Sequence, residues 1–316
     1  MMKIIFMGTP DFAAAALEAL VQAGHEITAV VTQPDKAKGR SKELQPPPVK
    51  VCALKYGIPV MQPRRIKTPE AIAALKEYEA DVYIVAAFGQ ILSQEILDIP
   101  PFGSLNIHAS LLPKYRGTSP IQHVILEGEE KTGITIMQMD AGIDTGDMLY
   151  QKEIAISPED NYETLHDKLK NLGGEAVTEA LQLLEQGKLS PRKQQEELSC
   201  YAPLISKEMG KIDFSLGAWS IERRIRALTP WPSAYTSYRG KQLKIWRAAP
   251  SVAENTYARK PGEILKIEKD AILVAAGEGA LRITEVQMEG KKRMSVHDFL
   301  LGVKVQPGEI LGENLD

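Results

Sequence analysis

The chain contains 316 residues, of which 44% are hydrophobic and 25% are charged, and its formal net charge is −3. These values are close to the averages of globular proteins and exclude collagen-like, low-complexity and strongly charged disordered chains. The length favours two domains over one. No apolar run approaches the length of about eighteen residues that a membrane helix requires, so we expect no membrane partner.

The two cysteines, Cys52 and Cys200, are far apart and lie in no CxxC or other metal-ligand spacing. Isolated cysteines are typical of reducing compartments, whereas zinc sites need closely spaced ligands. We therefore expect a cytoplasmic protein without a metal site. The opening residues MMKIIFMGTPDF contain an apolar stretch too short for a signal peptide, and they predict a first strand instead.

The first part of the chain alternates between strand and helix patterns. Residues 2–8 (MKIIFMG) form an apolar run, and Thr9 and Pro10 are residue types that begin an Ala-rich helix through about Leu20. The segment HEITAVVTQ predicts a second strand, and a polar loop follows over residues 34–48. This order of elements predicts a parallel sheet with both faces covered.

The same alternation continues toward the middle of the chain. Helical patterns lie near 49–56 and 69–77, and buried strands are predicted near 81–86 and 104–108. The sequence therefore predicts an α/β fold with a Rossmann-like, doubly wound and mostly parallel sheet. Ligands of such sheets bind beyond the carboxyl ends of the strands.

The second half of the chain changes character after a long helical segment. A strand is predicted at 133–140 and a Leu-rich helix at about 161–186, and the segment QQEELSCYAPLIS then has little periodicity. A short helical pattern and several alternating segments follow, which favour a small antiparallel barrel or sandwich. We expect a first domain over 1–189, a linker over 190–208 and a second domain over 209–316.

The charge is unevenly distributed between the two parts. Residues 204–316 contain 18 Lys and Arg against 14 Asp and Glu, a net charge of +4, so the remaining 20 against 27 give −7. A basic module attached to an acidic one is consistent with a polyanionic partner such as nucleic acid, although the charges taken alone favour ordinary surface variation.

Polar side chains converge at the end of the strand near 104–108. Successive side chains of a strand alternate between faces, so Asn106 and His108 project side by side, about 7 Å apart. Asp144 follows the next predicted strand in the loop AGIDTGD. All three could be hydrogen-bonded structural residues, and Asp beside Gly often caps backbone amides. They also suit acyl transfer, which uses an imidazole to move a proton, a carboxylate to orient it and an amide to bind an oxyanion.

Other chemistries lack their motifs. The first strand-to-helix turn reads GTPDF instead of GxGxxG, and no GxxxxGK[ST] is present. No Ser or Cys stands in a nucleophile elbow, so we expect the substrate to supply the nucleophile.

Several separated motifs resemble those of one enzyme family. The stretches NIHASLLPKYRGTSPIQ and GITIMQMDAGIDTGDML are similar to the signature of the folate-dependent formyltransferases. The resemblance extends over nearly the full chain through MGTPDFAAAALEAL, VVTQPDKAKGR, IVAAFGQILS, LISKEMGKIDF and RALTPWPSAY. It implies a Rossmann-like catalytic domain, a linker and an OB-like β-barrel that binds tRNA. It also implies transfer of the formyl group of 10-formyltetrahydrofolate to the α-amino group of methionine carried by initiator tRNA.

The resemblance also implies roles for individual residues. The family's catalytic residues fall on Asn106, His108 and Asp144, and its folate contacts fall on Ser110, Leu111, Leu112 and Pro113. Contacts with tRNA are expected from Lys38, Arg40 and Lys42 in the polar loop and from Arg223 and Lys244 in the second domain. A solvated basic loop and an exposed helix face are the alternatives for these cations.

Three other functions remain open at the level of sequence. The first is formyl transfer to a small amine such as glycinamide ribonucleotide or an amino sugar nucleotide, against which the basic second domain argues. The second is RNA binding without catalysis, against which the intact Asn106, His108 and Asp144 argue. The third is hydrolysis of the folate, in which water replaces the amine. We expect the protein to act as a monomer.

Overall fold

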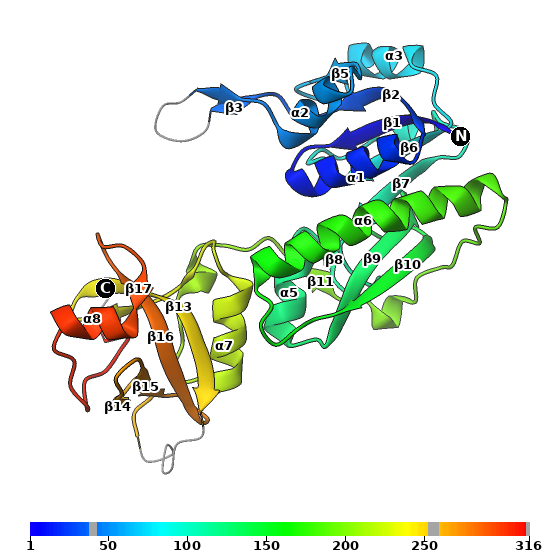
Figure 1. The fold of residues 1–316 in the computed structure, drawn as a ribbon. Coiled ribbons are helices and arrows are strands. Elements are labelled where there is room, and N and C mark those ends of the chain that lie inside the picture. The colour runs from blue at the N-terminus through cyan, green and yellow to red at the C-terminus, as the bar shows by residue number, and fades with distance from the viewer. Residues whose placement is uncertain (38–42, 252–258, 314–316) are drawn as a thin grey trace. The chain divides into compact units, whose positions relative to one another are not determined.

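The computed structural model describes residues 1–37, 43–251 and 259–313, and its chain divides into two compact units. The first unit comprises Met1–Pro120, Lys131–Ala155 and His166–Ala202, and the second comprises Ile121–Glu130, Ile156–Leu165 and Pro203–Asp316 (Figure 1). Among the residues described, no helix is both long enough and apolar enough to cross a membrane.

A seven-stranded sheet forms the centre of the first unit, with the strand order β10-β9-β7-β6-β1-β2-β5. The five neighbouring strands β7, β6, β1, β2 and β5 run parallel to one another. Strand β9 is antiparallel to both of its neighbours, β7 and β10. The sheet is therefore mixed but mostly parallel, which confirms the Rossmann-like prediction. Its strands are β1 (Lys3–Gly8), β2 (Glu26–Val31), β5 (Val60–Met61), β6 (Val82–Ala86), β7 (Ser104–His108), β9 (Lys131–Gln138) and β10 (Met148–Ala155).

Helices cover both faces of this sheet because its strands alternate apolar side chains toward two cores. On one face Ile5 and Met7 belong to a core completed by Leu75 of α3 (Pro69–Glu77) and Ile96 of α4 (Gln94–Leu97). On the other face Gly173 of α6 (Tyr162–Glu185) lies directly against the side chains of Phe12 and Ile107. The remaining helices of this part of the chain are α1 (Asp11–Gln22), α2 (Pro48–Lys55) and α5 (Pro120–Glu127).

The start of α1 differs from its predicted form. The N-cap residue is Pro10, which offers no side-chain cap, and the hydroxyl of Thr9 donates a hydrogen bond to the Phe88 carbonyl at 3.0 Å instead. Thr9 therefore joins the end of β1 to the loop after β6, at the edge of the sheet where parallel strands end.

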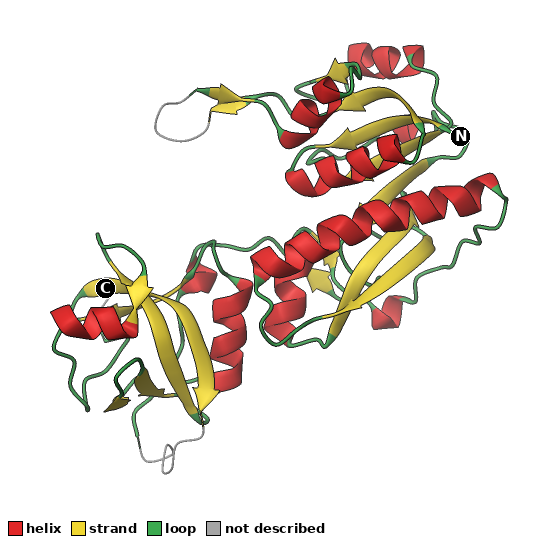
Figure 2. Ribbon diagram, viewed as in Figure 1, coloured by secondary structure: helices red, strands yellow, loops and turns green. Residues whose placement is uncertain are grey.

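The second unit is built around antiparallel strands in the order β12-β13-β16-β15-β14, with β17 paired to β16. Helices α7 and α8 lie beside this sheet (Figure 2), and side chains from both contribute to its core. The antiparallel β domain is confirmed, and the OB-like detail stays a prediction. Its elements are α7 (Ala218–Ala227), β12 (Ala234–Tyr238), β13 (Lys241–Ser251), β14 (Ile264–Ile267), β15 (Ile272–Ala275), β16 (Ala280–Met288), β17 (Met294–Ser295) and α8 (Val296–Gly302).

The segment after α8 connects the two edges of this second sheet. Leu311 donates its backbone N–H to the carbonyl of Gly262, just before β14, at 2.8 Å. The next residue, Gly312, donates to the carbonyl of Ser237 in β12 at 2.9 Å. Backbone groups at both edges are thereby paired, which protects them from association with other chains.

Short elements complete the structure. Residues 192–202, which we call the strap, are the last segment of the first unit. Their two-residue strand β11 (Tyr201–Ala202) pairs in parallel with β8 (Arg116–Gly117). The others are β3 (Lys36–Ala37), β4 (Leu44–Gln45) and the 3-10 helices η1 (Glu196–Leu198) and η2 (Glu208–Gly210).

Candidate active site

Three polar side chains that the sequence singles out lie together at the end of β7. Asn106 and His108 belong to β7, and Asp144 lies in the loop between β9 and β10. The Asp144 carboxylate lies 3.5 Å from Asn106 Nδ2 and 3.6 Å from His108 Nδ1. Because β9 pairs directly with β7, the loop that follows β9 can return over the β7 side chains. One carboxylate can therefore influence both other groups.

The environment of His108 assigns different roles to its two ring nitrogens. The ring is buried, and Nε2 lies 2.9 Å from the carbonyl oxygen of Tyr115. A carbonyl only accepts hydrogen bonds, so Nε2 carries a proton and donates it. In the neutral ring, Nδ1 is then the atom that can accept a proton. The nearby Asp144 carboxylate stabilises the positive charge that this proton would bring.

Asp144 is held by contacts that involve both its side chain and its backbone. Its carboxylate accepts the Gly117 N–H at 2.8 Å. Its backbone has a φ of 54°, a left-handed conformation that Asp tolerates better than most residues. Gln194 of the strap donates from Nε2 to the carbonyls of Asp144 and Gly146, both at 2.8 Å.

Sequence reasoning missed the Tyr115 carbonyl, the Gly117 amide and Gln194. The first two act through backbone atoms, which any residue type carries. Gln194 lies 50 residues from Asp144 in a segment without periodicity, so no local pattern indicates it.

The turn after β7 carries the predicted folate contacts and is itself well hydrogen-bonded. The Leu112 N–H donates to Thr135 Oγ1 at 3.0 Å, and Gln151 Nε2 donates to the Leu112 carbonyl at 2.9 Å. The Ser110 hydroxyl is fully buried and donates to the Lys114 carbonyl at 2.7 Å. Ser110 and Leu112 thus shape the turn from inside. The partly exposed members of the predicted set are Leu111 and Pro113.

The predicted tRNA contacts fall in three places. Lys38, Arg40 and Lys42 lie outside the described residues. The guanidinium of Arg223, on α7, packs against Gly128 and lies 3.5 Å from the carbonyl of Glu127. Lys244 projects from β13 with its Nζ 5.7 Å from the centre of the Trp246 ring. The structure therefore gives Arg223 a packing role in its own unit and leaves Lys244 beside an aromatic surface.

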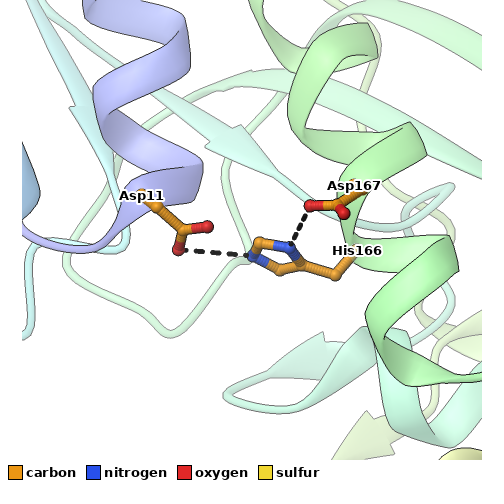
Figure 3. Close-up of side chains that lie close together, drawn as sticks. All are labelled: Asp11, His166 and Asp167. Atoms are coloured by element: carbon orange, nitrogen blue, oxygen red, sulfur yellow. Dashed lines mark ion pairs between the residues drawn. The ribbon is translucent and has the colours of Figure 1, made fainter.

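A second group of titratable residues lies between α1 and α6 (Figure 3). The ring of His166 points between Asp11 and Asp167, with nitrogen–oxygen distances of 3.7 and 3.5 Å. Such a group could hold a metal ion, but the Lys170 ammonium already lies 2.8 Å from Asp167 and 3.7 Å from Asp11. Lys170 holds the pKa of Asp167 below its usual range. The cluster is accordingly a set of ion pairs between two helices.

Comparison with known protein families identifies the class. A family model described as formyl transferase matches residues 2–181, and one described as formyl transferase, C-terminal domain, matches residues 204–304. The chain therefore belongs to the formyl transferase family.

Two relatives named methionyl-tRNA formyltransferase resemble the chain over nearly its whole length. The protein of Geobacter metallireducens is 50% identical over 311 residues, which cover 98% of this chain and 99% of the relative. That of Caldanaerobacter subterraneus subsp. tengcongensis is also 50% identical, covering 98% of this chain and all of the relative (100%).

Solved structures share the fold at lower identity. HypX from Aquifex aeolicus in complex with tetrahydrofolic acid is 20% identical with a TM-score of 0.63, covering 97% of this chain and 49% of that protein. The sugar 3N-formyl transferase WlaRD is 21% identical with a TM-score of 0.66, covering 92% of this chain and 99% of that protein. At these identities the similarity concerns the fold alone.

Proposed function

We propose that this enzyme transfers the formyl group of 10-formyltetrahydrofolate to the α-amino group of methionine on initiator methionyl-tRNA. The product, N-formylmethionyl-tRNA, serves translation initiation. The observation that carries this proposal is the match of both units, at 50% identity and almost full length, to proteins named methionyl-tRNA formyltransferase.

The three side chains at the end of β7 suit this reaction. Attack of a neutral amine on the formyl carbon places negative charge on the formyl oxygen and leaves a surplus proton on the nitrogen. Asn106 donates a hydrogen bond to the developing oxyanion. His108 accepts the proton at Nδ1, since Nε2 is committed to the Tyr115 carbonyl. When the oxyanion collapses to the carbonyl, the bond between the formyl carbon and N10 of the folate breaks, and N10 takes up the proton to leave as tetrahydrofolate. The Asp144 carboxylate, 3.6 Å from Nδ1, stabilises the protonated ring.

The substrates are assigned to neighbouring surfaces. The turn formed by Ser110, Leu111, Leu112 and Pro113 holds the folate, with Leu111 and Pro113 as the side chains that contact it. Its backbone is rigidly held by Thr135 and Gln151, which favours binding without reorganisation. The tRNA is bound by Lys38, Arg40 and Lys42 and by the second domain through Arg223 and Lys244, consistent with the net charge of the C-terminal part.

We propose residues 1–189 as the catalytic domain, 190–208 as a linker and 209–316 as an OB-like tRNA-binding domain, acting as a monomer in the cytoplasm. The free thiols of Cys52 and Cys200 support a reducing location. The antiparallel strands of the second unit and the C-terminal segment that pairs with both sheet edges support a barrel.

One assay tests the reaction and its substrate together. Formyl transfer from 10-formyltetrahydrofolate is measured to methionine on initiator tRNA, to methionine on elongator tRNA, to glycinamide ribonucleotide and to water. We expect kcat/KM to be highest for initiator methionyl-tRNA. A higher value for the small amine would replace the proposed substrate, and release of formate alone would indicate hydrolysis.

A further inference from the structure

We propose that Gln194 is a positioning residue that fixes the Asp144 loop and thereby sets the geometry of the catalytic group. This inference rests on the proposed function, because it concerns the same three side chains. It assigns to the strap a role in catalysis in addition to its role as a connection between the two units.

The Gln194 side chain makes three hydrogen bonds that use both ends of its amide. Nε2 donates at 2.8 Å to the carbonyl of Asp144 and at 2.8 Å to the carbonyl of Gly146. Oε1 accepts the Nε–H of Arg116 at 3.0 Å. An amide is the side-chain group that can donate twice and accept at once, so a carboxylate or an aliphatic group cannot replace it.

Arg116 orients this amide from the opposite side. Its side chain is buried, and its Nη1 lies 2.9 and 3.1 Å from the two carboxylate oxygens of Glu196. A buried guanidinium requires partners, since its desolvation is costly. Glu196 is largely exposed, so its ion pair with Arg116 contributes little energy by itself. Together with Gln194, however, it fixes the orientation of the planar Arg116 guanidinium. The strap therefore supplies two partners to one buried arginine.

The loop held by Gln194 needs such support because its backbone is unusual. Asp144 has a φ of 54°, a left-handed conformation that a residue with a Cβ adopts less readily than the ordinary right-handed one. The described part of the loop is exposed at residues 141–143 and at Thr145. Without the two donations from Gln194, its carbonyls can turn toward water and the carboxylate can leave His108.

Further along, the strap holds the other side of the same site. The Cys200 carbonyl accepts the Arg116 N–H at 2.9 Å, and Cys200 Sγ lies 3.2 Å from the Tyr115 nitrogen, which donates to it. The carbonyl of Tyr115 accepts from His108, and the N–H of Gly117 donates to Asp144. The segment 115–117 and the Asp144 loop are thus both fixed to the strap, and the imidazole lies between them.

The test compares Gln194→Ala and Gln194→Glu with Gln195→Ala in the full-length protein. Gln195 is the adjacent residue, is exposed and has no side-chain hydrogen bond among the described residues. We expect Gln194→Ala to lower kcat about 10- to 100-fold, as small misplacements of catalytic groups do, with KM for both substrates within about twofold of wild type. Gln194→Glu should lose at least as much, because its carboxylate faces two carbonyl oxygens. Gln195→Ala should match wild type.

Two further measurements separate positioning from a merely structural role. In an Asp144→Asn background, Gln194→Ala should cost little additional kcat, because both substitutions remove the same function. Hydrogen exchange of residues 140–147 should be faster in Gln194→Ala than in Gln195→Ala, and this readout does not depend on activity.

Equal exchange in the two variants would overturn the inference whether or not the enzyme has the proposed activity. The inference would also be overturned if Gln194→Ala alone kept the wild-type kcat. The same holds if the loss of kcat in the Asp144→Asn, Gln194→Ala protein were the product of the losses in the two single variants. An inactive wild type together with faster exchange in Gln194→Ala would reject the proposed reaction and retain the role of Gln194 in fixing the loop.

Discussion

His108 lies between two oxygen acceptors that differ in charge, and this difference determines what the ring can do. The neutral Tyr115 carbonyl fixes a proton on Nε2, whereas the Asp144 carboxylate faces Nδ1. In the proposed reaction the ring takes up the amine proton at Nδ1, the nitrogen that faces the negative charge of Asp144.

We propose that Asn106 acts mainly on the transition state, as the donor to the oxyanion. Its amide is 3.5 Å from Asp144, which is a weak hydrogen bond. We expect Asn106→Ala to lower kcat about 100- to 1,000-fold, the cost of one oxyanion donor, while KM for the folate stays near the wild-type value. Steady-state kinetics on both substrates measure this split.

The matched control is Asn171→Ala, which removes an exposed amide from α6. It should leave both constants unchanged. A loss in the Asn106 variant that is confined to KM would contradict the oxyanion role and indicate a substrate-binding one.

At the residue scale, the sequence predicted the side chains of the site better than their supports. The alternation of Asn106 and His108 in a strand is a local pattern, and both lie within 4 Å of one carboxylate in the structure. Gln194 and the Tyr115 carbonyl could not be predicted, because one is distant in sequence and the other is a backbone atom.

At the scale of elements, several segments with a clear apolar pattern were predicted, whereas two-residue strands were missed. The patterns at 69–77 and 161–186 correspond to α3 and α6, and the segment 104–108 is β7. The two-residue strands β8 and β11 were missed, since two residues carry no periodicity. These short strands nevertheless hold the site, because β8 supplies the amide that binds Asp144.

Gly117 shows how closely β8 and β11 approach each other. Its φ is 108°, and a Cβ at this position would lie 2.8 Å from the carbonyl oxygen of Ala202 and 2.9 Å from the ring of Tyr201. We expect Gly117→Ala to destabilise the protein by about 1–3 kcal/mol and to lower kcat, since the strap must move away from the site. Thermal unfolding and initial rates measure the two effects.

Gly187→Ala is the control for backbone conformation alone. Gly187 has a φ of 64° with no atom within 4 Å of a Cβ, so its replacement adds backbone strain without a steric clash. A Gly117→Ala protein that retains wild-type kcat would mean that the β8–β11 contact does not position Asp144.

His25 should make the stability of the fold depend on pH. It lies just before β2 and close to Glu185 at the end of α6. His25 is buried at its side chain, and its Nδ1 accepts the N–H of Met2 at 3.4 Å. Burial lowers the pKa of His25, although Glu185 nearby partly opposes this shift. The folded state therefore prefers the neutral ring, whereas the unfolded chain binds a proton below about pH 6.5.

We expect the free energy of unfolding to fall as the pH is lowered from 7.5 to 5.5, because the unfolded state then binds more protons than the folded state. His25→Gln should reduce this dependence, and denaturant unfolding at several pH values measures it. His297→Gln removes an exposed imidazole and serves as the control. An identical pH dependence in wild type and His25→Gln would show that another group is responsible.

At the scale of the whole molecule, the charge distribution and the proposed tRNA substrate lead to a test of specificity. Lysines and arginines that contact phosphates make tRNA binding depend strongly on salt. Removing one of them should weaken binding of every tRNA by the same factor. A residue that reads the acceptor end should instead change the preference between tRNAs. Lys244 beside Trp246 represents the first class, and Arg40 in the basic loop represents the second.

The measurement is kcat/KM for methionine on initiator and elongator tRNA at two salt concentrations, in wild type, Arg40→Ala, Lys244→Ala and Lys269→Ala. Lys269 is exposed next to β15, and its replacement controls for the loss of one charge from the same unit. We expect Lys244→Ala to lower kcat/KM for both tRNAs by the same factor and to weaken the salt dependence. Arg40→Ala should lower the ratio between the two tRNAs, because a planar guanidinium can stack on an unpaired base. Equal discrimination in all four proteins, with no effect of salt, would contradict the tRNA assignment and favour a small amine as the substrate.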